Sequence, residues 1–539
     1  MATTATVRQP RLLQRRRIIE RPRLYALLDE SKARVRTLVA PAGYGKTTLA
    51  EQWVQRDGRR AAWFTARPSS TDVAALALGL ARAATTLVPD CDARLREHLR
   101  ALPAPADNVE VLAEILGEDL GSWPADGWLV LDDYHEVARG ADAERFVATL
   151  VRVSSVRLLI ASRQRPSWVT ARGILYGEFL ELNQTALAMD SAEAAEVLSE
   201  EDAQSASGLV ALANGWPAVI GLAAISGADI DTEVAQVPES LYRFFAEEVY
   251  GALEDDVQRG LATLAIAPVI DRDVVTVLLG DSADPVCAKA LDVGILVERG
   301  AQLELHPLCR SFLEERSAQL GFVPRGESVL GCLSHYKDRC DWDAAFELIA
   351  RHGCTDRLEA LLCAALDELL ETARLSTIEA WCDLATGSAL DAPVFLLAKA
   401  ETTLRRGRYA EAQAYAEAAA SEDGSDLTFR ALSVAGRAAH LASREEDGLA
   451  LYQRAEAAAS TEAERRDALW GQFICAVDLE LPEAPSRYLE LTKGVKRSDP
   501  REVVRAAAYG LSYQVKTSSL DLEEADVAYE LLVAVPDAL

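Results

Sequence analysis

Four short apolar runs alternate with longer segments of helical periodicity in the first third of the chain. The runs cover residues 35–40, 61–66, 128–131 and 156–161. Strands that alternate with helices indicate a parallel α/β sheet, and runs that are apolar throughout indicate that helices cover both of its faces. We therefore expect the first of these strands and the strand that ends at Asp132 to be central in the sheet.

Helical periodicity replaces the strand pattern in the middle of the chain. Segments 191–198 and 208–225 are predicted to be helices of a small bundle. Residues 237–322 alternate helical patterns with a β-like pair at 295–298 and 303–305, which suits a small winged-helix unit. No second parallel sheet is predicted.

Helix pairs continue from about residue 326 to the end of the sequence. The best repeat pattern lies in residues 404–420, which match a tetratricopeptide (TPR)-like hairpin through Gly407, Tyr409, Ala412 and Ala416. Such hairpins stack into a solenoid whose concave face binds partners. The predicted fold class is therefore α/β plus all-α, with one parallel sheet, a helical bundle, a winged-helix unit and a C-terminal helical solenoid.

The segment Ala-Pro-Ala-Gly-Tyr-Gly-Lys-Thr-Thr at residues 40–48 follows the first predicted strand and precedes a helix. Gly43 and Gly45 can adopt positive φ, which lets backbone N–H groups turn onto phosphate oxygens. Lys46 would neutralise the β- and γ-phosphates, and the Thr47 hydroxyl is expected on Mg²⁺. We therefore expect a P-loop that binds ATP or ADP with Mg²⁺ through Ala42, Gly43, Tyr44, Gly45, Lys46, Thr47 and Thr48.

Two acidic residues end the predicted strand at 128–131. Asp132 would hold hydrated Mg²⁺, as a strand adjacent to the phosphate loop requires. Asp133 would polarise the attacking water, and is a candidate catalytic residue together with Lys46. The alternative for Asp133 is that it caps the strand or pairs with an arginine. His135, just beyond, is expected to be a packing residue.

The strand at 156–161 is followed by Ser162 and Arg163. This position places a guanidinium at the carboxyl edge of the sheet, where nucleotides bind in open parallel sheets. Arg163 could therefore contact the γ-phosphate. The alternative is an arginine that is solvated or salt-bridged.

The balance of charge argues against a nucleic-acid partner. Lys and Arg total 56 against 84 Asp and Glu, a net charge of −28, and this field repels a polyanion. Nine cysteines show no CxxC pair or zinc-like spacing, which fits a reducing cytoplasm. Residues 203–228 carry no charge but contain Gln204, Asn214 and Pro217, so we expect a buried helix pair and no membrane span there.

With these motifs in place, the chain resembles the MalT-type STAND regulators, the large ATP-binding LuxR-like family of signal-transduction ATPases. The resemblance covers roughly residues 11–420. It is carried by the loop at 40–48 and by the blocks Leu129-Val-Leu-Asp-Asp-Tyr-His135, Ser162-Arg163, Asn214-Gly-Trp-Pro217, Glu247-Glu-Val-Tyr250 and Leu305-His-Pro-Leu308. These ordered blocks are far more specific than a P-loop alone.

The resemblance implies a switch in which ADP locks a closed monomer, and inducer with ATP drives self-association. It also implies that Arg21 and Pro22 border the adenine, that Pro217 packs against the base, and that His306 contacts the β-phosphate of ADP. On the residues alone, Pro217 can equally be a helix break and His306 a buried core histidine. A contact from His306 would make closure depend on the nucleotide.

Five domains are expected: an N-terminal basic arm and adenine-side helix (1–34), a P-loop nucleotide-binding domain (35–185), a helical domain (186–236), a winged-helix domain (237–325) and a TPR-like helical repeat sensor region (326–539). The LuxR-type helix-turn-helix that usually ends such regulators is not recognisable after residue 420. We therefore expect either a fragment without its output domain or a shortened protein that acts through a partner, without direct DNA binding by this chain. Transcriptional control is inherited by analogy.

Three functions compete on this sequence. The first is a nucleotide-gated sensor switch with slow ATPase activity, whose helical repeats receive an effector or a protein. The second is a metabolic P-loop enzyme, such as a small-molecule kinase. The third is a scaffold protein with a vestigial P-loop, against which the complete set of Lys46, Thr47, Asp132 and Asp133 argues. The sequence favours the switch.

Overall fold

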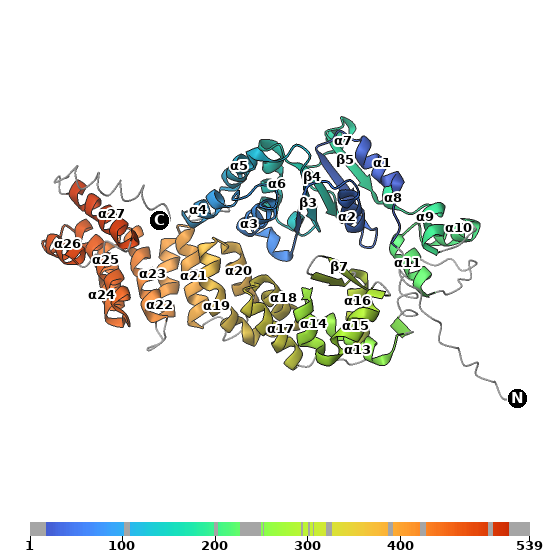
Figure 1. Cartoon of the computed structure of the whole chain (residues 1–539). Helices are drawn as coiled ribbons and strands as arrows, with labels where there is room; N and C mark the ends of the chain where they lie inside the picture. Colours follow the sequence, from blue (N-terminus) through green and yellow to red (C-terminus); the bar gives the residue numbers. More distant parts are fainter. Residues whose placement is uncertain are drawn as a thin grey trace. The chain divides into compact units, whose positions relative to one another are not determined.

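A computed structural model of the chain describes residues 18–101, 108–198, 203–226, 250–251, 253–292, 295–299, 302–305, 307–319, 326–385, 392–420, 427–493 and 500–516. The chain forms two compact units, one of Met1–Glu97 with Pro105–Gly353 and one of His98–Ala104 with Cys354–Leu539. His306 and the basic arm before residue 18 lie outside the described residues. Figure 1 labels the helices and strands.

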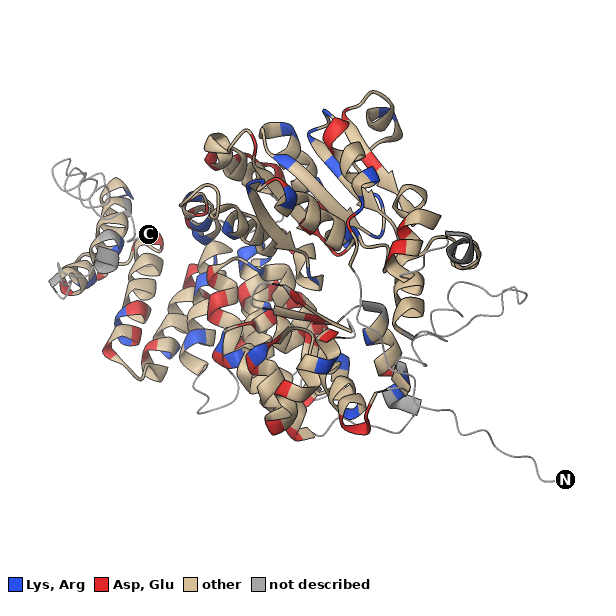
Figure 2. Ribbon diagram, turned by 45° about the vertical axis from the view of Figure 1, so that its right-hand side comes forward, with Lys and Arg blue, Asp and Glu red and all other residues tan. Residues whose placement is uncertain are grey.

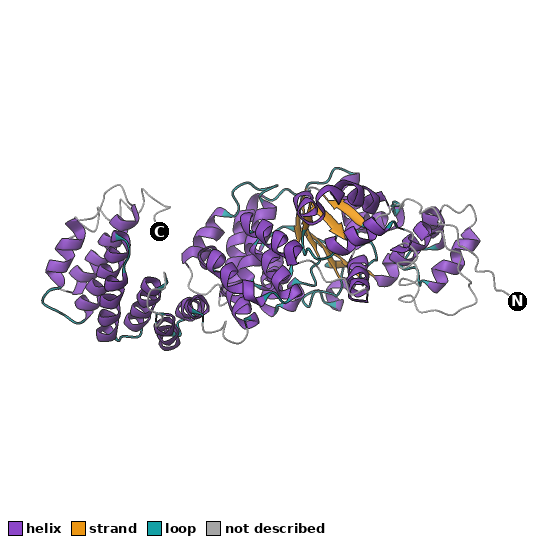
Figure 3. Ribbon diagram, turned by 90° about the horizontal axis from the view of Figure 1, so that it is seen from below, coloured by secondary structure: helices purple, strands orange, loops and turns teal. Residues whose placement is uncertain are grey.

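The first unit begins with an α/β region. Its principal elements are α1 (Pro22–Glu30), β1 (Val35–Val39), α2 (Lys46–Arg56), β2 (Ala61–Thr65), α3 (Val73–Ala84), α4 (Ala93–Ala101), α5 (Val109–Asp119), β3 (Trp128–Asp132), α6 (Ala141–Val153), β4 (Arg157–Ser162), α7 (Ala171–Leu175), β5 (Phe179–Asn183) and α8 (Gln184–Leu187). The four predicted strands are confirmed. In Figure 3 the strands of this sheet are flanked by helices.

The five strands are all parallel, in the order β2-β3-β4-β1-β5. Both β1 and β3 lie inside the sheet as expected, and all five residues of β3 are buried. The expectation that the strand ending at Asp132 is adjacent to the phosphate-loop strand is wrong, because β4 lies between them. The chain passes from β1 through α2 to β2 at the far edge, and β3 and β4 later fill the positions in between.

The described part of the chain continues with the helices α9 (Ser191–Leu198), α10 (Ala203–Leu212) and α11 (Pro217–Ser226). A region of helices around a smaller antiparallel sheet follows. Its elements are α13 (Asp255–Leu264), β6 (Ile270–Asp271), α14 (Arg272–Leu279), α15 (Ala283–Asp292), β7 (Leu296–Arg299), β8 (Gln302–Leu305), α16 (Pro307–Gln319), α17 (Gly326–Asp338) and α18 (Trp342–His352). The predicted β-like pair is confirmed as the antiparallel pair β7 and β8, with β6 on the other side of β8.

The second unit is built from consecutive helices. They are α19 (Leu358–Glu371), α20 (Leu375–Leu384), α21 (Pro393–Arg405), α22 (Tyr409–Ala419), α23 (Thr428–Leu441), α24 (Glu445–Ala458), α25 (Glu462–Asp478), α26 (Ala484–Lys493) and α27 (Pro500–Lys516). The helices α21, α23 and α25 begin at Pro393, Thr428 and Glu462, about 34 residues apart, which is the TPR repeat length. Each helix from α21 to α25 packs on the next, as in a solenoid.

Small residues let these repeat helices approach each other. Tyr452 of α24 is buried between Gly436 of α23 and Gly471 of α25. Gly407 has a φ of 73° and ends the turn between α21 and α22, as the predicted hairpin requires. Among the described residues, no helix is long and apolar enough to span a membrane.

Candidate nucleotide-binding site

The loop between β1 and α2 has the backbone that phosphate binding requires. Gly43 and Gly45 have φ values of 79° and 72°, in the left-handed region that favours glycine. Gly45 is the N-cap of α2, so the N-terminus of an 11-residue helix begins at Lys46. The unpaired N–H groups and positive end of that helix therefore meet the loop, as expected from the sequence.

Lys46 is a buried cation at the start of α2. Its side chain is nine-tenths buried, and its Nζ donates a hydrogen bond to the carbonyl of Pro41 at 2.9 Å. Burial lowers the pKa of Lys46 to about 8, an effect that Asp133 and Asp132 partly oppose. Arg163 lowers this pKa further, which shows that the loop gathers positive charge at one place. An anion such as a phosphate would relieve that charge.

Thr47, at the start of α2, contacts Asp132, at the end of β3, although β4 lies between β3 and the strand β1 that precedes α2. The Thr47 hydroxyl donates a hydrogen bond to Asp132 Oδ1 at 3.0 Å, and the backbone N–H of Asp133 donates to the same oxygen at 3.0 Å. Asp132 is only 2% exposed. A hydroxyl and a carboxylate at the end of a P-loop are the oxygen ligands that Mg²⁺ takes beside nucleotide phosphates, so these residues fit the metal.

Asp133 lines the same pocket and stands on strained backbone. Its φ of 50° lies in the left-handed region, and its side chain is 40% exposed. The nearest ring nitrogen of His135 is 3.8 Å from Asp133 Oδ1. Burial lowers the pKa of His135 to about 4, with Asp133 opposing, so His135 is neutral at pH 7. Its side chain is 13% exposed, which agrees with the packing role expected for it.

A pocket that is partly open to solvent lies around the loop. Arg163 and Pro217 line this pocket together with the loop and Asp133. Its lining residues are Ile18, Ile19, Arg21, Ala42, Gly43, Gly45, Lys46, Thr47, Thr48, Leu49, Gln52, Asp133, Arg163, Met189, Val197, Pro217, Ala218, Gly221, Leu222, Ile225, Val297, Glu304 and Cys309. The large apolar share of this lining suits a nucleobase.

Arg21 lines the pocket, but its guanidinium is already engaged. It donates to the carbonyls of Leu187 and Ala188, both at 2.9 Å, and pairs with Glu193 at 2.8 Å. Arg21 therefore ties the segment before α1 to α8 and α9. Pro22 is the exposed first residue of α1 and is not among the lining residues.

Trp216 is a site residue that sequence reasoning missed. Its Nε1–H donates to the carbonyl of Ala42 at 3.0 Å, and its ring stacks on Tyr44 with centroids 6.2 Å apart. Tyr44 is 4% exposed and its hydroxyl accepts a hydrogen bond from Gln184 at 2.8 Å. Tyr44 thus faces these protein groups and is absent from the pocket lining. The signal was the Asn214-Gly turn, which precedes an aromatic residue.

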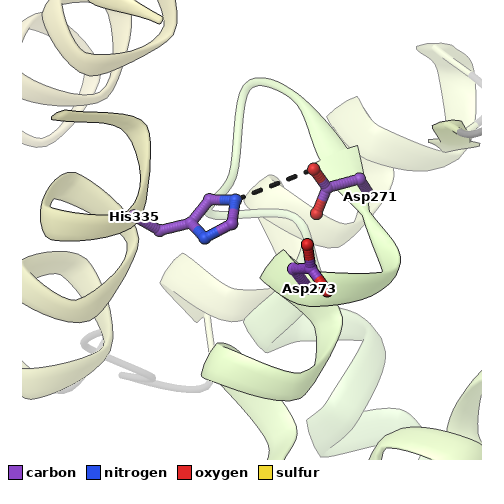
Figure 4. A group of neighbouring side chains, drawn as sticks. All are labelled: Asp271, Asp273 and His335. Atoms are coloured by element: carbon purple, nitrogen blue, oxygen red, sulfur yellow. Dashed lines mark ion pairs between the residues drawn. The ribbon is translucent and has the colours of Figure 1, made fainter. Parts of the chain in front are cut away.

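A second group of potential ligands lies away from this pocket. His335 of α17 faces Asp271 and Asp273 at the start of α14, with His335 Nε2 3.7 Å from Asp271 (Figure 4). The guanidinium of Arg339 pairs with both carboxylates, at 3.8 Å and 3.2 Å. Because Arg339 already pairs with both acids, the group is explained as an ion-pair network between α14 and α17.

No family model matches the chain. Over 282 residues it is 27% identical to the HTH-type transcriptional regulator MalT of Vibrio cholerae, a match that covers 49% of this chain and 30% of that protein. Over 341 residues it is 26% identical to MalT of Yersinia pestis, covering 61% and 36%. The chain thus spans about a third of the length of these relatives.

One solved structure shares the fold along almost the whole chain. It is the Signal Transduction ATPase with Numerous Domains (STAND) protein with a tetratricopeptide repeat sensor from Pyrococcus horikoshii. The TM-score is 0.70 at 16% identity, and the match covers 99% of this chain and 79% of that one. The resemblance drawn from the sequence is confirmed by the two kinds of similarity together: the chain is similar in sequence to MalT regulators, and it shares its fold with a STAND protein.

Proposed function

We propose that this protein is an ATP/ADP-dependent signal-transduction switch that binds its nucleotide with Mg²⁺. The observation that carries the proposal is the 3.0 Å contact between the Thr47 hydroxyl and the buried Asp132 carboxylate, next to the buried cation of Lys46. A threonine at the start of one helix and a carboxylate at the end of a strand, beside a lysine at the same helix N-terminus, are the groups that a nucleotide–magnesium site requires.

Each residue of the site has a distinct role. The backbone of residues 42–48 cradles the phosphates, Lys46 pairs with the β- and γ-phosphates, and Thr47 with Asp132 holds the metal. When bound, Mg²⁺ supplies charge neutralisation of the phosphate oxygens. Asp133 is positioned to orient a water molecule, and Arg163 to meet the γ-phosphate. Pro217 and the apolar lining around it would receive the base.

The architecture and the matched relatives support the proposal of a switch. The helical repeats of the second unit offer a surface for an effector or a protein, and the ATP state is proposed to self-associate. The matched relatives are named transcriptional regulators, so control of transcription is the proposed output. This chain is not expected to bind DNA itself because its net charge is −28. Sequence-specific retention on DNA at moderate salt would contradict that expectation.

The first experiment identifies the nucleotide. The protein is purified, denatured, and any released nucleotide is separated by chromatography, and the dissociation constants for ADP and ATP with Mg²⁺ are then measured. Lys46→Ala is expected to weaken binding at least 100-fold, since it removes a buried charge that pairs with phosphate. Lys32→Ala, which removes an exposed lysine before β1, is the control and should bind normally. Equal affinity of Lys46→Ala and the unaltered protein would refute the site.

A further inference from the structure

We infer that Trp216 is a positioning residue for the phosphate loop. Together with the start of α11, it hydrogen-bonds two carbonyls of the loop on the side away from the phosphates. These bonds orient the N–H groups that follow the two carbonyls towards the phosphates. This inference rests on the proposed function, because it concerns the regulation of the same nucleotide site. It assigns to the helical region after β5 a direct control over phosphate affinity.

Two consecutive carbonyls of the loop are bonded from one side. Trp216 Nε1–H donates to the carbonyl of Ala42 at 3.0 Å, and the backbone N–H of Ala218 donates to the carbonyl of Gly43 at 3.0 Å. The indole also stacks on Tyr44, with an angle of 16° between the ring planes. Three neighbouring loop residues are therefore held by two residues that lie more than 170 positions later in the chain.

Because of the geometry of the peptide group, these contacts also set the direction of the N–H groups that would bind phosphate. A trans peptide is planar, so its N–H points opposite to its C=O. Fixing the carbonyls of Ala42 and Gly43 towards Trp216 and α11 therefore directs the N–H groups of Gly43 and Tyr44 the other way. In a P-loop, these are groups that donate to phosphate oxygens. Preorganised donors bind an anion without an ordering cost at the moment of binding.

The turn before α11 aims the indole. Asn214 and Gly215 have φ values of 49° and 65°, and the N–H of Met189 donates to the carbonyl of Gly215 at 2.8 Å. A Cβ at Gly215 would lie 2.7 Å from the carbonyl oxygen of Met189, so that position admits only glycine without a shift. Trp216 itself is 8% exposed, which limits its freedom once the turn is formed.

The same helix also lines the pocket. Pro217, Ala218 and Gly221 of α11 face the space where the base is proposed to sit. The helix α11 thus lines the part of the pocket proposed for the base, and its start also orients the loop N–H groups proposed to bind the phosphates. A shift of α11 away from the loop would release both at once, so the phosphate affinity should report the position of this helix.

The test removes the indole N–H and asks which part of the nucleotide loses affinity. Trp216→Phe keeps an aromatic ring against Tyr44 but cannot donate to Ala42. The dissociation constants of ADP and of adenosine, which has no phosphate, are measured for each protein. We expect ADP to bind roughly 3- to 10-fold more weakly, the effect of one lost hydrogen bond, and adenosine to bind unchanged.

Trp123→Phe is the matched control. Trp123 is 7% exposed and donates through Nε1 to the backbone carbonyl of Gly127 at 3.1 Å, away from the pocket. Its variant loses the same kind of bond and should bind both ligands as the unaltered protein does. Gly215→Ala is a second variant, which displaces the turn before the indole and should also weaken ADP more than adenosine.

The outcomes separate this inference from the proposed function. Equal loss for ADP and adenosine in Trp216→Phe, or no loss for either, would overturn the positioning role while leaving the nucleotide site intact. Failure of the unaltered protein to bind ADP would overturn the proposed function and this inference with it. A loss confined to ADP in Trp216→Phe, and a larger loss for ADP than for adenosine in Gly215→Ala, with Trp123→Phe unaffected, would establish that α11 controls the phosphate loop.

Discussion

Lys46 carries a positive charge that the protein alone compensates only in part. Its Nζ finds one backbone carbonyl, that of Pro41, and burial disfavours the ammonium form. Asp133 and Asp132 oppose this effect, yet the pKa still falls from 10.5 to about 8. Phosphate oxygens would supply the missing negative charge, so the site is arranged for an anion that arrives from solution.

This arrangement predicts that nucleotide binding takes up a proton near pH 8. The free protein is then about half protonated at Lys46, and the phosphates raise the pKa of Lys46 in the complex, so roughly half a proton is bound with the nucleotide. Affinity for ADP should therefore be highest below pH 8 and fall as pH rises through it. Calorimetry in two buffers with different ionisation enthalpies measures the uptake.

Lys46→Arg is the control for this measurement. Arginine keeps its proton at every pH of the experiment, so the uptake near pH 8 should disappear even if affinity drops. The terminal phosphate is already ionised at this pH and contributes no proton of its own. Identical binding enthalpies in the two buffers for the unaltered protein would show that Lys46 is charged before the nucleotide binds.

The residues of the pocket were predictable where the motif is local in sequence. Gly43, Gly45 and Lys46 belong to one loop, so their spacing alone indicates the chemistry. Trp216 was not predicted as a site residue because its partner, Ala42, lies 174 residues earlier, and only the folded chain brings the two together. Pro22, which the family resemblance places beside the adenine, begins α1 and is not among the lining residues, whereas the preceding Arg21 is.

Elements were predicted best where burial is complete. The strands β1, β3 and β4 are internal, and most of their residues are apolar, which made them recognisable in the sequence. The edge strand β5 was missed because Glu181 and Asn183 interrupt its apolar run, whereas the other edge strand, β2, keeps the largely apolar sequence Ala-Ala-Trp-Phe-Thr. The order of strands was not readable from the apolar pattern, which does not record which strand lies next to which.

At the level of packed helices, Gly471→Ala is predicted to destabilise the repeats. An added Cβ would lie 2.3 Å from the ring of Tyr452, so the buried ring or the helices α24 and α25 must move. Such overpacking costs about 1–3 kcal/mol, whereas replacing glycine by alanine inside a helix gains about 1 kcal/mol. The net change should be a loss of stability, visible as faster hydrogen exchange in peptides from α24 and α25.

Gly221→Ala provides the comparison. Gly221 lies inside α11 with nothing within 4 Å of an added Cβ, so the helix propensity of alanine should act alone. Exchange in α11 should stay the same or slow down. Unchanged exchange of α24 and α25 in Gly471→Ala would mean that Tyr452 moves aside at little cost, and that the close approach of these helices is not what stabilises the repeat.

Charge acts on the molecule as a whole. The chain carries a net charge of −28. Figure 2 shows acidic and basic residues interspersed along the described helices. Two copies of such a chain repel each other beyond the contacts of any interface. This repulsion is screened over about 10 Å at 0.1 M salt and over shorter distances at higher salt.

The proposed self-association in the ATP state should therefore strengthen with ionic strength. With ATP and Mg²⁺ saturating, sedimentation is expected to show assembly at several-fold lower protein concentration in 300 mM salt than in 50 mM salt, because screening weakens repulsion between like charges. Lys46→Ala, which is expected to bind the nucleotide at least 100-fold more weakly, should stay monomeric at both salt concentrations. Assembly that weakens as salt is added would instead mean that opposite charges meet across the interface and outweigh the net charge, and the acidic surface would then have to be complemented locally by basic residues of the second copy.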